Sequence, residues 1–185
     1  MKIIGITGTL GAGKGTVVDY LIKNKGFNHF SVRQFLLEEI RRQKLPENRD
    51  SMVVVANELR KLNSPSYITD QLYLQAVKLA KNAVIESIRT PGEVDSLRKK
   101  GNFYLFAVDA DPKTRYVRIR SRNSETDRID YDTFIQNEQR EMTSSDPFSQ
   151  NLQKCREMAD FVFRNDGAVN ELYEKVEEVL SGIGV

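Results

Sequence analysis

Short apolar runs alternate along the chain with segments in which apolar residues recur every three or four positions. The runs are typical of buried parallel strands, and they predict strands at residues 2–7, 29–32, 83–88, 103–108 and 160–165. The helical period predicts helices over residues 14–23, 34–44, 51–62, 69–81, 91–101, 112–122, 133–142, 151–158 and 168–180. Because strands and helices alternate, we expect an α/β fold whose parallel sheet is covered on both faces.

The stretch GTLGAGKGT lies between the first predicted strand and the first predicted helix. Gly8, Gly13 and Lys14 fit the phosphate-loop pattern G-x-x-x-x-G-K, but Gly15 stands where a serine or threonine would follow the lysine. Backbone N–H groups and the dipole of the following helix favour an anion at such a turn, and a lysine adds a point charge for the β- and γ-phosphates. We therefore expect nucleotide binding by Gly8, Thr9, Leu10, Gly11, Ala12, Gly13, Lys14, Gly15 and Thr16.

Three arginines follow predicted strands or lie on one helix face, where they would reach a phosphate. Arg89 comes directly after the strand at 83–88, at the carboxyl edge of the sheet, where ligands bind in open α/β folds. Arg118 and Arg122 are four residues apart and share a helix face, which is either a phosphate-binding surface or a solvated basic face. Together with Lys14, these arginines are the expected catalytic residues of a phosphoryl transfer.

Two acids at strand ends compete for a role beside Mg²⁺. Glu86 lies near the end of the strand at 83–88, and Asp109 ends the strand at 103–108. Either acid is otherwise a helix cap or a loop residue, so the residues leave open which one serves the metal. The Asn-Lys pair at 24–25 lacks the aspartate of a guanine-reading Asn-Lys-x-Asp motif, which argues against a GTPase.

Composition places the chain among ordinary globular proteins. Its 185 residues are 39% hydrophobic and 29% charged, with a net charge of +2, which gives no reason to expect nucleic-acid binding. The single cysteine, Cys155, excludes an internal disulfide and suits a reducing compartment. The apolar runs are too short for membrane spans. We expect a soluble cytoplasmic protein in which the single histidine, His29, has a structural role.

These motifs resemble those of the nucleoside monophosphate kinase superfamily, within it the dephospho-CoA kinase-like and adenylate kinase-like proteins. The Gly-Lys-Gly-Thr sequence is the adenylate kinase form of the loop, in which Thr16 takes the family's threonine position and joins Glu86 and Asp109 as a candidate for the metal. VIESIRTPGEVDSLRK resembles the family segment whose arginine, here Arg89, binds acceptor or transferred phosphate. VDADPKTRYVRIRSR resembles the segment with two arginines that leads into the lid.

The resemblance implies further site residues and a division of the chain. The turn with Asn165 and Gly167 would lie beside the adenine of ATP, and Arg49, Asn57, Arg60 and Arg89 would bind the acceptor. The implied fold is a three-layer P-loop fold with a five-stranded parallel sheet, in one domain. Its parts would be a core (residues 1–30, 69–121 and 150–185), an acceptor-binding helical insertion (31–68), and a short lid with its following helix (122–149).

The leading hypothesis is an ATP- and Mg²⁺-dependent kinase for a small nucleotide-like acceptor, a nucleoside or deoxynucleoside monophosphate or dephospho-CoA, in a monomer or homodimer. The alternative is a nucleotide-binding sensor, or a slow ATPase, that has lost efficient transfer. Its motivation is the replacement of the family's Asp-Gly pair by Glu86 and Ser87, and the presence of Gln34 and Leu37 where related insertions carry aspartate and arginine.

Overall fold

The computed structural model describes residues 1–122 and 129–185 of the chain. Its strands are β1 (Ile3–Thr7), β2 (Asn28–Ser31), β3 (Ala83–Glu86), β4 (Phe103–Asp109) and β5 (Phe161–Arg164). Its helices are α1 (Lys14–Lys25), α2 (Val32–Arg42), α3 (Arg49–Leu62), α4 (Tyr67–Leu79), α5 (Pro91–Lys99), α6 (Pro112–Ser121), α7 (Tyr131–Met142), α8 (Leu152–Glu157) and α9 (Val169–Gly182).

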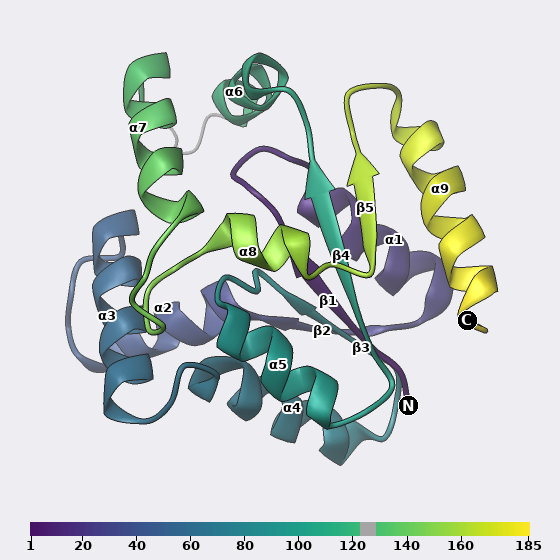
Figure 1. Ribbon diagram of the computed structural model, residues 1–185, viewed down its shortest axis with the longest axis horizontal. Coiled ribbons are helices and arrows are strands. Elements are labelled where there is room, and N and C mark those ends of the chain that lie inside the picture. The colour runs from purple at the N-terminus through teal and green to yellow at the C-terminus, as the bar shows by residue number, and fades with distance from the viewer. Residues whose placement is uncertain (123–128) are drawn as a thin grey trace.

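The five strands form one parallel sheet in the order β2-β3-β1-β4-β5 (Figure 1). β1 is central, with Ile6 opposite Glu86 of β3 on one side and opposite Phe106 of β4 on the other. The carboxyl ends of all five strands therefore lie along one edge of the sheet. The predicted α/β fold with a five-stranded parallel sheet is confirmed.

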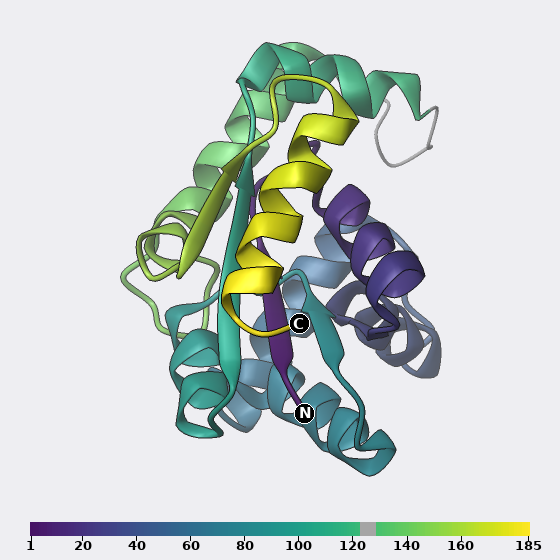
Figure 2. The ribbon, with the colours of Figure 1, turned by 90° about the vertical axis from the view of Figure 1, so that its right-hand side faces the viewer.

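Helices cover both faces of the sheet (Figures 1 and 2). Alternate strand residues point to opposite faces: Ile3 belongs to a core shared with α2, α3, α4, α5 and α8, and Ile4 to a core shared with α1 and α9. The buried side chains of the first core are mostly aliphatic, and those of the second include Phe27, Phe106 and Phe163. Burial on both faces fixes the register of the central strands. No helix of the described residues is long and apolar enough to cross a membrane.

Two element boundaries differ from the sequence prediction for reasons that local geometry explains. Ser31 ends β2 and also caps α2, because its hydroxyl accepts a hydrogen bond from Gln34 N at 3.2 Å. The helix predicted from residue 34 therefore begins at Val32. β3 ends at Glu86 rather than at residue 88, since Ser87 has a φ of 72° and leaves the extended conformation.

The predicted division into core, insertion and lid remains a prediction. α2 and α3 lie inside the range expected for the insertion. The lid is expected at the beginning of the range 122–149, and residues 123–128 of that range lie outside the described residues.

Candidate active site

The P-loop (residues 8–16) turns from β1 into α1 in a backbone conformation that requires glycine. Gly8 has a φ of 141°, and a Cβ on it would lie 2.1 Å from the Val108 carbonyl oxygen. Gly13 has a φ of 101°, and a Cβ there would lie 2.1 Å from Nδ2 of Asn165. Positive φ and close backbone approach both exclude a side chain at these two positions. These glycines let the loop pack directly against the end of β4 and the turn after β5, which holds the N-terminus of α1 in the position of an anion-binding helix end.

Lys14 folds back over this loop. Its Nζ donates hydrogen bonds to the carbonyl oxygens of Gly8 and Thr9, each at 2.9 Å. Burial, helped by the nearby charge of Arg89, lowers the pKa of Lys14 from 10.5 to about 7. An anionic ligand beside Lys14 would reverse this effect, because it stabilises the protonated form.

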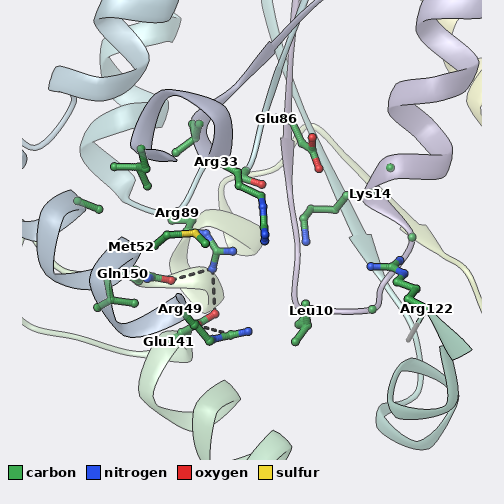
Figure 3. Close-up of a pocket in the computed structure, with 18 of the residues that line it drawn as sticks. Leu10, Lys14, Arg33, Arg49, Met52, Glu86, Arg89, Arg122, Glu141 and Gln150 are labelled. Atoms are coloured by element: carbon green, nitrogen blue, oxygen red, sulfur yellow. Dashed lines mark hydrogen bonds and ion pairs between the residues drawn. The ribbon is translucent and has the colours of Figure 1, made fainter. Parts of the chain in front are cut away.

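A cavity of about 340 Å³ joins the P-loop to a group of arginines (Figure 3). Its P-loop end is lined by Leu10, Gly11, Gly13, Lys14 and Gly15. Its arginine end is lined by Arg33 of α2, Arg49 of α3 and Arg89 after β3. One wall is apolar and consists of Val32, Leu36, Met52, Val53 and Ala56. The cavity thus combines a phosphate-loop lysine, several guanidinium groups and apolar side chains.

The two candidate metal-side acids lie in different places. Glu86 lines the cavity beside Lys14, and its Oε2 lies 3.1 Å from Nε2 of His29. Burial raises the pKa of Glu86, but the hydrogen bond with His29 and the charge of Lys14 outweigh it, so the pKa is lowered overall. Asp109 instead lies 2.8 Å from Nη1 of Arg156 and 3.3 Å from Nη1 of Arg164, and is not among the described residues that line this cavity. The structure therefore places Glu86, and not Asp109, in the cavity.

A magnesium ion at this position is compatible with the donors present. The described residues contain no group of three or more histidine, cysteine, aspartate or glutamate side chains that could hold a metal by themselves. Mg²⁺ in phosphate-transfer sites is commonly held by one or two protein oxygens together with substrate phosphates and water. The Glu86 carboxylate, with its lowered pKa, fits such a set. Thr16 lies in the first turn of α1, next to the lining residue Gly15, and is not itself among the described lining residues; its hydroxyl would be the second oxygen.

Arg49 and Arg89 meet at one carboxylate. Arg49 Nη2 donates to Glu141 Oε1 at 2.5 Å, and Arg89 Nη1 donates to Glu141 Oε2 at 2.9 Å and to Gln150 Oε1 at 2.8 Å. The dashed lines of Figure 3 trace this bridge. Two arginines from distant parts of the sequence are thus held with their guanidinium groups at the cavity.

Arg60 also lines the cavity, but its guanidinium group is paired with a buried acid in the protein interior. It is 1% exposed and donates through Nη2 to Glu93 Oε1 at 2.9 Å, with Glu93 itself fully buried. Asn57 accepts a long hydrogen bond of 3.5 Å from Arg60 Nη1. Glu93 in turn accepts from the backbone N–H groups of Arg89 and Thr90 through Oε2. Arg60 therefore anchors α3 to the backbone that carries Arg89.

Arg118 and Arg122 have different surroundings, although they are only four residues apart in the sequence. Arg122, the C-cap of α6, lines the cavity near Lys14. Arg118 Nη1 donates to the carbonyl oxygen of Asn165 at 2.8 Å, and Arg118 is not among the described lining residues. The two arginines thus contact different parts of the site.

The turn after β5 supports the P-loop from behind. The Asn165 amide is 5% exposed and donates through Nδ2 to the Ala12 carbonyl oxygen at 2.8 Å. Gly167 follows in the same turn, where a Cβ would lie 2.4 Å from Oε2 of Glu171. The predicted contact of this turn with a base remains a prediction.

Sequence reasoning did not identify several residues that shape the site. Arg115 donates to the carbonyl oxygens of Leu10 and Ala110 and pairs with Glu138 of α7. Glu141 and Gln150 likewise come from segments with no recognisable motif. The only sequence signal for Arg115 is its place in an arginine-rich helix, since its partner lies 23 residues later in the chain.

Comparison with known proteins gives the family and the fold. A family model described as AAA domain (AAA_18) matches residues 4–144. A UPF0200 protein of Methanococcus vannielii is 31% identical over 186 residues, which cover 99% of this chain and 97% of the relative.

Solved structures with low sequence identity share the fold over nearly the full length. TT1252 from Thermus thermophilus is similar with a TM-score of 0.63 at 19% identity, covering 100% of this chain and 98% of the other. A gluconokinase from Sinorhizobium meliloti is similar with a TM-score of 0.58 at 13% identity, covering 98% of this chain and 91% of the other. The expected resemblance to P-loop kinases is confirmed at the level of the fold. The chain belongs to the UPF0200 protein family and to the AAA-domain family, with the fold of a P-loop kinase.

Proposed function

We propose that this protein transfers the γ-phosphoryl group of ATP to a small phosphorylated acceptor of the nucleotide type. The acceptor classes that fit are nucleoside or deoxynucleoside monophosphates and dephospho-CoA. The observation that carries the proposal is that Lys14 of the P-loop and the paired arginines Arg49 and Arg89 line the same cavity. A phosphate at each end of such a cavity would place two nucleotide-like substrates next to each other.

At the P-loop end, the chain supplies a complete set of groups for a polyphosphate. The α1 N-terminus and the P-loop amides bind the phosphate oxygens, and Lys14 exchanges its two loop carbonyls for the β- and γ-phosphates. Asn165 and Arg115 hold the loop in shape through the carbonyls of Ala12 and Leu10. Arg118 holds the turn where the base of ATP would lie.

At the arginine end, Arg49 and Arg89 bind the phosphate of the acceptor, and Met52 and Val53 offer an apolar surface to its base. Arg122 lies on the far side of Lys14 and neutralises the phosphoryl group in transfer. The acceptor oxygen attacks the γ-phosphorus of ATP in line, and the bond between that phosphorus and the bridging oxygen breaks to release ADP. The protein therefore positions the substrates and neutralises charge but supplies no nucleophile. Mg²⁺, held by Thr16 and Glu86, would neutralise charge on the β- and γ-phosphates.

The test is an acceptor screen that follows ADP formation with ATP and Mg²⁺. The panel contains the nucleoside and deoxynucleoside monophosphates and dephospho-CoA, with gluconate as a sugar acid suggested by the name of one structural relative. The proposal expects at least one phosphorylated acceptor to raise ADP formation well above the acceptor-free rate. If gluconate alone did so, the acceptor class would be wrong; if no compound did, kinase activity itself would be contradicted.

A sensor or slow ATPase is the second candidate, and one contact favours it. Glu141 forms ion pairs with both Arg49 and Arg89 in this structure, so neither arginine is free to bind the phosphate of an acceptor. Tight ATP binding by calorimetry, together with no acceptor-dependent product across the panel, would support this candidate over the kinase.

A further inference from the structure

Glu141 is an acid buried at the arginine end of the cavity. Its side chain is 10% exposed, and each of its two oxygens accepts a hydrogen bond from a different arginine, Arg49 and Arg89. Burial raises the pKa of Glu141, but the charges of Arg89 and Arg49 outweigh it and lower the pKa overall, so the group is an anion. A negative charge therefore already lies between the two arginines that face the cavity.

The position of Glu141 on its helix does not favour a carboxylate. It lies in the last turn of α7, which ends at Met142. Unpaired carbonyl groups give the C-terminus of a helix partial negative charge, which disfavours an acid there. The two arginines, rather than the helix, hold the carboxylate in place. If another anion takes the place of its carboxylate, Glu141 loses the two arginine hydrogen bonds that the structure gives it.

Carboxylate and phosphate use the same faces of a guanidinium group. Arg89 has Gln150 as a second partner through the same nitrogen, which leaves its orientation fixed when Glu141 departs. α7 also stays anchored, because Glu138, one turn before Glu141, pairs with Arg115 beside the P-loop. Release of Glu141 thus requires a local change at the end of α7, and Gln150 keeps Arg89 aimed at the cavity.

We propose that Glu141 is a built-in competitor for the acceptor's phosphate: it occupies Arg49 and Arg89 while the site is empty, and a phosphorylated acceptor binds by displacing it. This inference rests on the proposed function for the identity of the ligand. It makes Glu141 a residue that sets acceptor affinity, since weakly charged acceptors fail to compete with it. Its side chain keeps the arginines paired when no acceptor is bound, which avoids leaving two partly buried cations without a partner.

The test measures binding of inorganic phosphate by isothermal titration calorimetry, without ATP and without an acceptor. Glu141→Gln keeps the shape of the side chain and removes its charge, and we expect it to bind phosphate about tenfold more tightly than wild type, the size of one charge-assisted hydrogen bond. Asp132→Asn is the matched control, since it removes one charge from an exposed position at the other end of α7 and should leave phosphate affinity unchanged.

Because the P-loop can also bind phosphate, the gain must be assigned to the arginine end. The triple variant Arg49→Ala/Arg89→Ala/Glu141→Gln, which lacks both arginines that Glu141 contacts, should bind phosphate no better than the double variant Arg49→Ala/Arg89→Ala. A gain that persists in the triple variant, or an affinity of Glu141→Gln equal to or below that of wild type in a folded protein, would overturn the proposal. Thermal unfolding checks the fold. If Glu141→Gln does not fold, Glu141→Asp, whose shorter side chain cannot bridge both arginines equally, should show a smaller gain in the same titration.

The outcome is separable from that of the proposed function. Acceptor-dependent transfer with unchanged phosphate affinity in Glu141→Gln would overturn this inference and leave the kinase proposal standing. Tighter phosphate binding by Glu141→Gln, with no transfer to any acceptor by the wild type, would support this inference and contradict the kinase proposal.

Discussion

The two ends of the cavity are built in different ways. The P-loop end comes from consecutive residues between β1 and α1, and its shape is fixed by backbone geometry and by hydrogen bonds to loop carbonyls. The arginine end is assembled from α2, α3, the segment after β3 and α7, and ion pairs hold it together. A short sequence motif therefore specifies the P-loop end. The arginine end depends on tertiary structure, because its ion pairs join residues that lie far apart in the sequence.

The largest expected effect comes from removing the charge at the P-loop end. Lys14→Ala deletes the cation that faces the β- and γ-phosphates, and we expect phosphoryl transfer to fall by on the order of 10³-fold. Steady-state ADP formation is the measurement. Lys23→Ala, an exposed lysine on the same helix, is the control and should keep wild-type activity. Near-normal transfer in Lys14→Ala would contradict the role of the loop.

Breaking the ion pair beneath the arginine end should damage the fold. Arg60→Met leaves the fully buried Glu93 without its cation, and we expect a loss of about 3 kcal/mol in the free energy of unfolding. Urea denaturation measures this loss, and Arg60→Met/Glu93→Gln should recover part of it because the buried charge is gone. A stable Arg60→Met variant with weakened acceptor binding would instead show that Arg60 serves the ligand.

Arg122 and Arg118 offer a comparison within one helix end. Arg122 lines the cavity and Arg118 holds the Asn165 carbonyl, so Arg122→Ala should lower kcat by about 10²-fold, the usual cost of one donor to a transition-state charge. Arg118→Ala should chiefly raise the KM for ATP. If Arg118→Ala instead lowered kcat and Arg122→Ala raised the KM for ATP, the catalytic arginine would be Arg118.

The smallest effect concerns pH. With its pKa lowered to about 7, Lys14 is largely protonated below pH 7 and loses its proton as the pH rises above 7. Only the protonated form attracts phosphate, so ATP affinity should fall about fivefold from pH 7 to pH 8. Calorimetry in buffers of different ionisation enthalpy should also show proton uptake on binding at pH 8.

Lys14→Arg is the control for this pH dependence. The arginine keeps its charge between pH 7 and pH 8, and its ATP affinity is measured in the same way. Any loss of ATP affinity that the variant shares with wild type is therefore due to ionisation of ATP and not of residue 14. An identical pH profile in both proteins would contradict the lowered pKa of Lys14.

The contrast between the two ends also explains what the sequence predicts. Apolar periodicity predicts the sheet and its helices, and one contiguous glycine-lysine motif predicts the P-loop. The structure contains the predicted parallel sheet, with the motif at the start of α1. Glu86 and Asp109 both end or nearly end strands, and sequence position could not separate them, because the arginines that hold Asp109 away from the cavity come from α8 and β5.

The arginine end shows the limit of such reasoning. Arg49 and Arg60 look equivalent in the sequence, but one faces a buried acid at the cavity and the other a fully buried acid beneath it. Glu141 belongs to no motif, and its place between Arg49 and Arg89 arises only when α7 packs beside α3 and the end of β3. Charge partners that are 52 and 92 residues away cannot be read from local pattern.

The most direct test of the account compares the two ends in one assay. For the best acceptor of the panel, acceptor-dependent ADP formation is measured in wild type and Arg49→Ala, and ATP affinity is measured for both by calorimetry. Because Arg49 lies at the arginine end alone, the account predicts a KM for the acceptor about tenfold higher, with the Kd for ATP unchanged. A Kd for ATP that rises as much as the acceptor KM, or an acceptor KM that stays at the wild-type value, would contradict a cavity that holds the two substrates at opposite ends.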